Sequence, residues 1–143
     1  MFLGKFNHSL DNKNRLSLPS KFVCKLPKQI CISKGFDGCL EIRTPAEFQK
    51  RLNILTEKDE NKKTNRDLLR IFTNNTIEVN IDKANRILIS SELLKEASII
   101  KDVVVCGSAN RIEIWDVKKY QEFVNRVQPK YEELAEKDGR WLS

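Results

Sequence analysis

An aspartate followed four residues later by an arginine occurs twice in the chain, as Asp11 with Arg15 and as Asp82 with Arg86. An aspartate carboxylate accepts hydrogen bonds from nearby backbone amides and so shapes a tight turn. An arginine guanidinium is a fork of donors that can bind a phosphate, or both O6 and N7 of guanine. Each segment therefore predicts a turn with a basic side chain at its end, which suits an anionic partner.

The same spacing also has an interpretation that needs no partner. Asp11 could pair with Arg15, and Asp82 with Arg86, as ion pairs that close the two turns. We expect this internal role more strongly for the second segment, because the residues around it carry a net negative charge that repels phosphate. Arg15 could serve both roles in part.

The positive charge lies mainly in the first part of the chain. The whole sequence has a net charge of +6, and residues 1–53 alone hold ten basic and four acidic side chains. Residues 76–116 instead hold five basic and seven acidic side chains. A basic segment beside an acidic one indicates an anionic partner that approaches from one side. By charge alone, nucleic acid and a set of solvated lysines explain the pattern equally well.

The two turns belong to a longer internal repeat. Residues 10–22 read LDNKNRLSLPSKF and residues 81–93 read IDKANRILISSEL, at a constant offset of 71 residues. Two copies are too few for a solenoid, which needs at least about three units. We therefore expect two similar modules that fold together as a pseudo-dimer.

Each copy predicts the same order of elements. Residues 15–18 alternate polar and apolar side chains, as a half-buried strand does, and Pro19 suits the start of a short helix. Asparagine tolerates positive φ, which the turn requires at Asn14 and Asn85. The predicted strands are 2–10, 15–18, 30–33 and 39–43, then 77–81, 86–89, 103–106 and 111–115, with short helices over 20–26 and 90–97.

Helices are predicted outside the repeated core. Thr44 with Glu47 forms a capping box at a helix start, and Asp116 caps a final helix that Pro129 ends or kinks. Residues 57–63 read as an exposed charged linker and residues 66–72 as a short amphipathic helix. The expected divisions are a first module over 1–53, a linker with a short helix over 54–75, a second module over 76–116, and a C-terminal helix and tail over 117–143.

The composition argues against several classes of protein. His8 is the only imidazole, no serine lies in a G-x-S-x-G frame, and no phosphate-binding glycine loop occurs, so we expect no enzyme, cofactor or small-molecule substrate. The four cysteines form no C-x-x-C pair and predict buried free thiols, without a metal, in a reducing compartment. No apolar stretch approaches the roughly 20 residues of a membrane helix, so a cytoplasmic protein is expected.

Four motifs together resemble the MraZ family: MFLG at Met1, L-D-x-K-x-R-L-x-L-P from Leu10, I-D-K-A-x-R-I-L-I from Ile81 and G-x-x-x-R-I-E-I-W-D from Gly107. The resemblance implies an α+β fold of two tandem, pseudo-symmetric AbrB-like modules, each a swapped-hairpin β-barrel, with short helices and a C-terminal helix. It also implies ring homo-oligomers that bind double-stranded DNA at promoter repeats of the division and cell-wall gene cluster, in the nucleoid.

The resemblance also assigns the DNA-reading residues. Carried onto this chain, they are Lys13, Asn14 and Arg15, with Asp11 shaping the turn. The family usually has glycine at the fourth position of this turn, where asparagine stands here. Because asparagine is the next best residue at positive φ, we expect the turn to persist.

The remaining site residues have smaller expected roles. Lys5 and Lys21 are candidate phosphate contacts, although single lysines are usually solvated. In the second copy Asp82, Asn85 and Arg86 are expected to shape the turn.

The sequence thus predicts a sequence-specific DNA-binding transcriptional regulator. One alternative is an AbrB-like antitoxin that represses its own operon and binds a toxin through its tail. Another is a ring-forming interaction scaffold without a DNA role.

Overall fold

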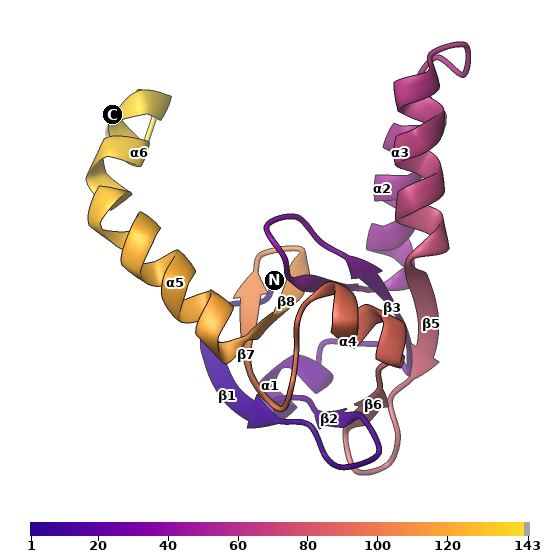
Figure 1. Ribbon diagram of the computed structural model, residues 1–143, viewed down its shortest axis with the longest axis vertical. Helices are drawn as coiled ribbons and strands as arrows, with labels where there is room; N and C mark the ends of the chain where they lie inside the picture. The colour runs from indigo at the N-terminus through magenta and orange to yellow at the C-terminus, as the bar shows by residue number, and fades with distance from the viewer. Residues whose placement is uncertain (142–143) are drawn as a thin grey trace.

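Each copy of the repeat contributes four strands to the fold, and the computed structural model describes residues 1–141 (Figure 1). These strands lie within one or two residues of the predicted bounds, except that the first begins at Lys5. In the first copy they are β1 (Lys5–Ser9), β2 (Arg15–Ser17), β3 (Gln29–Lys34) and β4 (Leu40–Arg43). In the second copy they are β5 (Thr76–Asn80), β6 (Arg86–Leu88), β7 (Asp102–Ser108) and β8 (Arg111–Asp116).

The two copies exchange strands. One antiparallel sheet of six strands has the order β1-β7-β8-β4-β3-β5, so β1 of the first copy pairs with the β7–β8 hairpin of the second. In the same way β5 of the second copy pairs with the β3–β4 hairpin of the first. The hairpins meet where β4 pairs with β8. Neither copy has a complete sheet without the other, so the two fold together.

The second strands of the two copies pair with each other and form a separate two-stranded ribbon. In this ribbon Arg15 lies opposite Leu88, and Ser17 lies opposite Arg86. Leu16 and Ile87 face each other on the other side and are buried in the core. Because side chains alternate along a strand, this pairing leaves both arginines on the outward face.

The core is shared between the copies. Apolar side chains from both hairpins, from the ribbon and from Phe22 form one continuous cluster. The burial of each isoleucine or leucine side chain stabilises the folded state by roughly 1.5–3 kcal/mol. The largest side chains that are less than 2% exposed are Phe22, Leu16, Ile30, Ile32, Leu40, Ile42, Ile87, Ile89, Ile112 and Ile114.

The helices form two short covers and two arms that project from the sheet (Figure 1). The first arm is an antiparallel hairpin of α2 and α3, in which the rings of Phe48 and Phe72 stack 5.3 Å apart. Within residues 1–141 no helix is both long and apolar enough to cross a membrane. The helices are α1 (Ser20–Val23), α2 (Pro45–Thr56), α3 (Lys63–Asn74), α4 (Ser91–Glu96), α5 (Val117–Val127), the 3-10 turn η1 (Gln128–Lys130) and α6 (Tyr131–Asp138).

The predicted N-caps at Thr44 and Asp116 are confirmed, whereas the Glu47 carboxylate of the predicted capping box pairs with Lys50 at 3.2 Å instead. The Thr44 hydroxyl accepts a hydrogen bond from the Glu47 amide at 3.2 Å. The Asp116 carboxylate accepts bonds from the amides of Lys118 and Lys119 at 3.1 and 3.4 Å. Side-chain acceptors at these positions satisfy amides that have no partner within the helix.

Two segments are more helical than predicted. The expected charged linker over 57–63 is a loop over residues 57–62, and α3 begins at Lys63 rather than at the predicted residue 66. Lys63 pairs with Asp67 one turn away at 2.6 Å, which supports the first turn of α3. The chain after Pro129, predicted only as a tail beyond the final helix, forms α6. The apolar pattern does not mark the first turn of α3, because residues 63–67 are all polar or charged.

The α+β class is confirmed, whereas a closed barrel is not seen. Across residues 1–141 the six-stranded sheet ends at β1 and β5, and these two strands do not pair with each other. Within the described residues one isolated bridge involves the ribbon, and it joins Leu16 of β2 to Leu10, the residue that follows β1. The sheet is therefore open along these edges.

Gly107 in β7 provides a test of the N-terminal packing. A Cβ at this position would lie 2.3 Å from the carbonyl carbon of Phe2 and 2.4 Å from the Leu3 nitrogen. We expect Gly107→Ala to lower the free energy of unfolding by about 1–3 kcal/mol through this backbone overlap. Chemical denaturation measures the change, with Ser108→Ala as the neighbouring control. Equal stability of both variants would contradict the packing described.

Candidate nucleic-acid interface

The first turn is built around the carboxylate of Asp11. Its Oδ1 accepts hydrogen bonds from the backbone amides of Lys13 and Arg15 at 2.9 and 2.8 Å. Its Oδ2 accepts a third bond from Nε of Arg15 at 2.8 Å. Asn14 has φ of 60°, as predicted for this position. One side chain thus fixes both the path of the turn and the direction of the arginine.

The second turn has the same geometry. Asp82 accepts bonds from the amides of Ala84 and Arg86 at 2.9 and 2.8 Å, and from Nε of Arg86 at 2.9 Å. Asn85 has φ of 62°. The expectation that the internal ion pair belongs mainly to the second copy is therefore wrong. Local geometry sets this pair, and the different net charges of the two modules do not change it.

Each arginine uses only one edge of its guanidinium in the turn. The ion pairs involve Nε, and within the described chain the terminal nitrogens of Arg15 and Arg86 make no hydrogen bond or ion pair. The two side chains are 32% and 34% exposed. Two parallel donors on each arginine are thus oriented by an aspartate and available to an acceptor outside the protein.

Both arginines lie on one outward face of the β2–β6 ribbon. Because Arg15 lies opposite Leu88 and Ser17 opposite Arg86, the two arginines are diagonal neighbours. Such neighbours are about 7–8 Å apart in an antiparallel pair. This spacing is close to two base-pair steps, at about 3.4 Å each along one strand of DNA.

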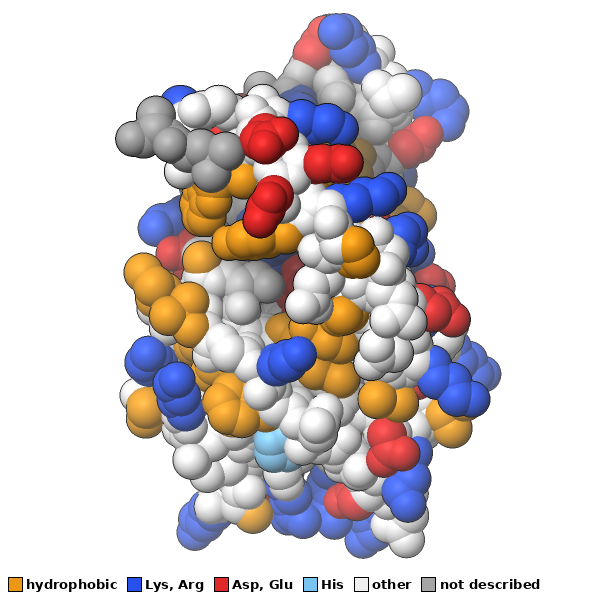
Figure 2. Space-filling model, turned by 90° about the vertical axis from the view of Figure 1, so that its left-hand side faces the viewer, with side chains coloured by type: hydrophobic (Ala, Val, Ile, Leu, Met, Phe, Trp, Pro, Cys, Tyr) orange, Lys and Arg blue, Asp and Glu red, His pale blue; other side chains and the backbone are white. Residues whose placement is uncertain are grey.

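Further lysines surround this arginine face. Exposed Lys13 and Lys83 stand on the first and second turns. The Leu10 amide donates to the carbonyl of Lys101 at 2.9 Å, and the Ile81 amide donates to that of Lys28 at 2.8 Å, so one exposed lysine lies beside the start of each turn. Figure 2 shows several basic side chains at the lower end of the molecule, which is the end where β2 and β6 lie in Figure 1.

Lys28, Lys83 and Lys101 were missed by the sequence analysis. Lys83 lies within residues 81–93 of the repeat, so its position on the second turn could have been predicted from the sequence. Lys28 and Lys101 are brought to the turns only by strand exchange, because each bonds to the copy to which it does not belong.

Lys5 and Lys21 lie outside the arginine face. Lys5 is at the far end of β1 from the turn, and its ammonium group stands 5.7 Å from the ring centre of Tyr120. Lys21 is exposed on α1, after the end of β2. The structure brings Lys13, Asn14 and Arg15 together with the second turn but does not bring Lys5 to them.

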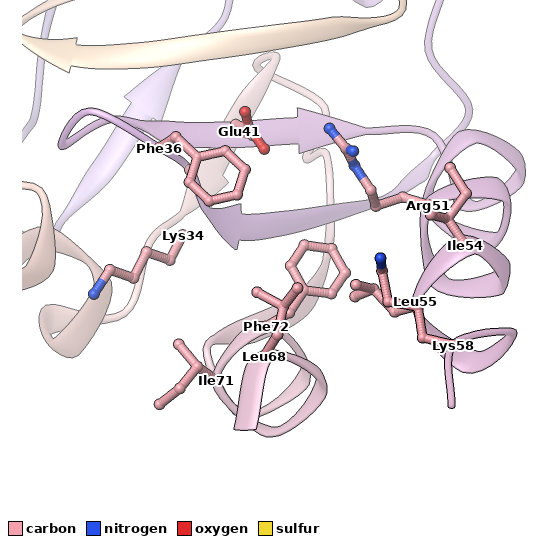
Figure 3. Close-up of a pocket in the computed structure, with 11 residues that line it drawn as sticks. Lys34, Phe36, Glu41, Arg51, Ile54, Leu55, Lys58, Leu68, Ile71 and Phe72 are labelled. Carbon is pink, nitrogen blue, oxygen red and sulfur yellow. The ribbon is translucent and has the colours of Figure 1, made fainter. Parts of the chain in front are cut away.

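A second region with possible chemistry is a groove beside the first helical arm. It has a volume of about 340 Å³ and lies between the α2–α3 hairpin and the loop after β3 (Figure 3). Its lining is mainly apolar. The residues are Lys34, Gly35, Phe36, Glu41, Arg51, Ile54, Leu55, Lys58, Leu68, Ile71 and Phe72.

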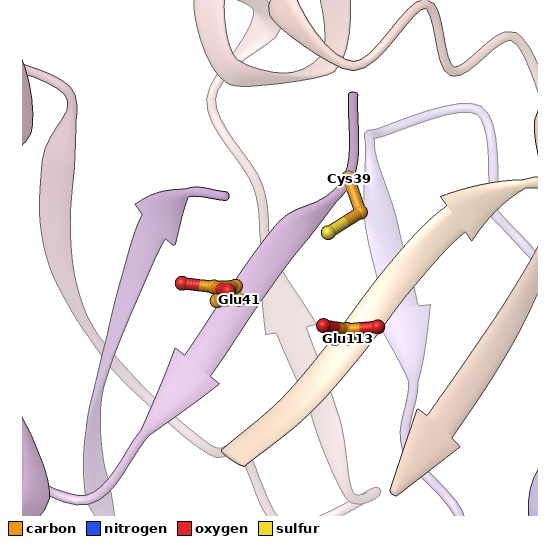
Figure 4. A group of neighbouring side chains, drawn as sticks. All are labelled: Cys39, Glu41 and Glu113. Carbon is orange, nitrogen blue, oxygen red and sulfur yellow. The ribbon is translucent and has the colours of Figure 1, made fainter. Parts of the chain in front are cut away.

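A third region is a buried group of Cys39, Glu41 and Glu113, whose ligand atoms lie within 4.8 Å of one another (Figure 4). The Glu41 carboxylate is already paired with Arg43 at 2.8 Å and with Arg111 at 3.1 Å. A metal ion would have to displace both guanidinium groups.

The other two members of this group are also occupied or inert. Glu113 accepts bonds from Arg111 at 3.0 Å and from the Trp115 indole at 3.1 Å. The Cys39 thiol donates a hydrogen bond to the carbonyl of Phe36 at 3.3 Å, and burial raises its pKa above the ordinary value. The arrangement therefore fits an internal network better than a metal centre.

The turn aspartates give a prediction on pH. The backbone amide of Arg15 is the main reason why the pKa of Asp11 lies below its ordinary value, and the amide of Arg86 acts in the same way on Asp82. A lowered pKa stabilises the turn above the unfolded value of about 3.9, and the effect is lost as pH falls through the lowered pKa. NMR titration should find both carboxyl midpoints below about 3.9. Midpoints at or above this value would contradict the bonding described.

Comparison with known proteins identifies the family. A family profile described as "MraZ protein, putative antitoxin-like" matches residues 1–71 and again residues 72–141. A transcriptional regulator MraZ of Mycoplasmoides gallisepticum is 41% identical over 136 residues, covering 95% of this chain and 96% of that protein. Its counterparts in Mesoplasma florum and Pediococcus pentosaceus are 45% and 35% identical, over 95% of this chain and 94% and 95% of their own lengths. The chain therefore belongs to the MraZ family of transcriptional regulators.

Proposed function

We propose that this transcriptional regulator binds specific DNA sequences through the outward face of the β2–β6 ribbon. One observation carries the proposal: Arg15 and Arg86 are each held at Nε by an aspartate and present their terminal nitrogens on the same face. Arginine in this form can donate two bonds to O6 and N7 of a guanine in the major groove. The aspartates orient the arginines before binding, which reduces the entropy lost on DNA.

The surrounding residues have supporting roles in this proposal. Lys13 and Lys101 contact phosphates at the first turn, and their counterparts Lys83 and Lys28 do so at the second. Asn14 and Asn85 allow the turns to reach positive φ. Phosphate contacts from Lys21 and Lys5 would extend the footprint beyond the turns.

Assembly belongs to the same proposal. One ribbon is a small footprint, so we propose a ring homo-oligomer that engages repeated boxes in the promoter of the division and cell-wall gene cluster, in the cytoplasm at the nucleoid. Several linked sites raise affinity by about 10²–10⁴-fold when they can bind together. The exchange of β1 and β5 between the copies supports an AbrB-like swapped-hairpin arrangement. The divisions 1–53, 54–75, 76–116 and 117–143 remain part of this proposal.

The antitoxin-like wording of the family description favours one second candidate. In that function the chain would repress its own operon and hold a toxin through its C-terminal arm. The two functions share the DNA face, and a second protein that co-purifies through α6 would distinguish the antitoxin.

The arginines provide the first test of DNA binding. Loss of one bidentate pair costs about 1–3 kcal/mol, or roughly 5- to 150-fold in affinity for each site. Arg15→Ala and Arg86→Ala should each lose this much on the promoter repeats in a gel shift. Arg126→Ala, which removes an exposed arginine from α5, is the control. Wild-type affinity in the Arg15 variant would overturn the proposal.

The salt dependence of DNA binding distinguishes residues that contact bases from residues that contact phosphates. It also tests the alternative of a scaffold that does not bind DNA. Specific DNA binding should weaken steeply between about 50 and 200 mM salt. Lys28→Ala should lower the slope of log affinity against log salt by about one for each copy that binds DNA, with little change in sequence preference. A protein that retains no DNA at any salt concentration would fit the scaffold alternative instead.

A further inference from the structure

The groove beside the first arm exposes apolar side chains that the DNA face does not use. Phe36, Ile54, Leu68 and Ile71 line it and are 68%, 54%, 40% and 55% exposed. They come from both helices of the hairpin and from the loop after β3, so together they form one concave surface (Figure 3). We call this surface the hairpin groove. Contiguous exposed apolar surface of this kind marks an interaction site.

Two cations border the hairpin groove without partners of their own. Arg51 and Lys58 make no ion pair or side-chain hydrogen bond within residues 1–141, whereas nearby Lys34 pairs with Glu96 at 2.8 Å. The groove therefore combines an apolar floor with unpaired positive charge. An occupant with apolar and acidic side chains would match both properties.

The second arm carries such a surface at α6. Tyr131 and Leu134 are 62% and 49% exposed and stand three residues apart, which places them on one side of the helix. Exposed Glu132, Glu133 and Glu136 accompany them, and none of these carboxylates forms an ion pair within the described chain. An amphipathic helix with this chemistry fits an apolar groove in the helix-in-groove mode.

We propose that α6 of one copy docks in the hairpin groove of a second copy of this chain. The inference rests on the self-association included in the proposed function and names the surfaces that meet. Figure 1 shows the two arms on opposite sides of the sheet, so the groove of a copy is remote from its own α6. Each copy can therefore offer its helix to one neighbour and its groove to another.

The contact is heterologous, since it joins two different surfaces. A contact of this type repeats from copy to copy and closes into a ring when the rotation allows it. The turns lie at the end of the molecule opposite both arms, so docking leaves the arginine faces free. Assembly and DNA binding thus use separate surfaces.

Complementation between two variants tests this contact. Ile71→Asp places a charge in the groove and Leu134→Asp places one on α6, both at exposed positions. Each variant should be monomeric by light scattering at concentrations where the wild type assembles. An equimolar mixture should form a heterodimer and stop there, because only the intact helix of one and the intact groove of the other remain. Ile100→Asp, at an 84% exposed apolar position outside both surfaces, should keep the wild-type mass.

Other results would overturn the inference. Wild-type mass in both single variants, or a mixture that stays monomeric, excludes the helix-in-groove contact. Loss of assembly in the Ile71 variant alone would indicate that grooves pair with each other. Circular dichroism confirms that the variants are folded. The double variant Arg51→Glu, Lys58→Glu should weaken assembly without altering the apolar floor.

The proposed function can fail separately from this inference. A monomeric wild type that binds promoter DNA would refute both assembly and docking but leave DNA recognition intact. An assembled wild type without DNA binding would refute recognition alone.

Discussion

Each copy of the repeat completes its sheet with a strand from the other copy, and the rest of the structure depends on this exchange. β1 lies on the β7–β8 hairpin and β5 lies on the β3–β4 hairpin, so the apolar faces of both copies enter one core. The same exchange brings β2 beside β6 and turns their arginines to one side. A copy alone would present one arginine on an unpaired strand, without a partner to define its face.

A single carboxylate then fixes the path of each turn and the direction of its arginine. It accepts hydrogen bonds from two backbone amides and from Nε of the arginine. A change in the path of the turn would therefore also move the arginine side chain. The two turns are alike in their aspartates, asparagines and arginines but differ in lysine position, because Lys13 and Lys83 stand at successive places in the repeat. The arginine face is thus symmetric at its centre and asymmetric at its edge.

Two buried glutamates face each other at the centre of the sheet, and without neighbouring cations their repulsion would destabilise it. Glu41 and Glu113 lie directly opposite each other in the β4–β8 pair, where like charges repel. Arg111 bridges them, and Arg43 completes the pairing of Glu41. Because a slip of one residue would leave these buried charges without partners, the network favours this register more than it adds to stability.

The sequence by itself determined the repeat, the two turns and the N-caps at Thr44 and Asp116, because these follow from local spacing and local hydrogen bonding. The positive φ at Asn14 and the capping role of Thr44 could be predicted because each depends only on residues nearby in the sequence. The tertiary structure alone decided which strand pairs with which, and so placed Arg86 beside Arg15 and brought Lys28 and Lys101 to the turns of the opposite copies. The tertiary structure also decided that the α2–α3 hairpin leaves an apolar groove exposed beside the loop after β3. These features depend on contacts between residues far apart in the chain, and neither periodicity nor charge count contains that information.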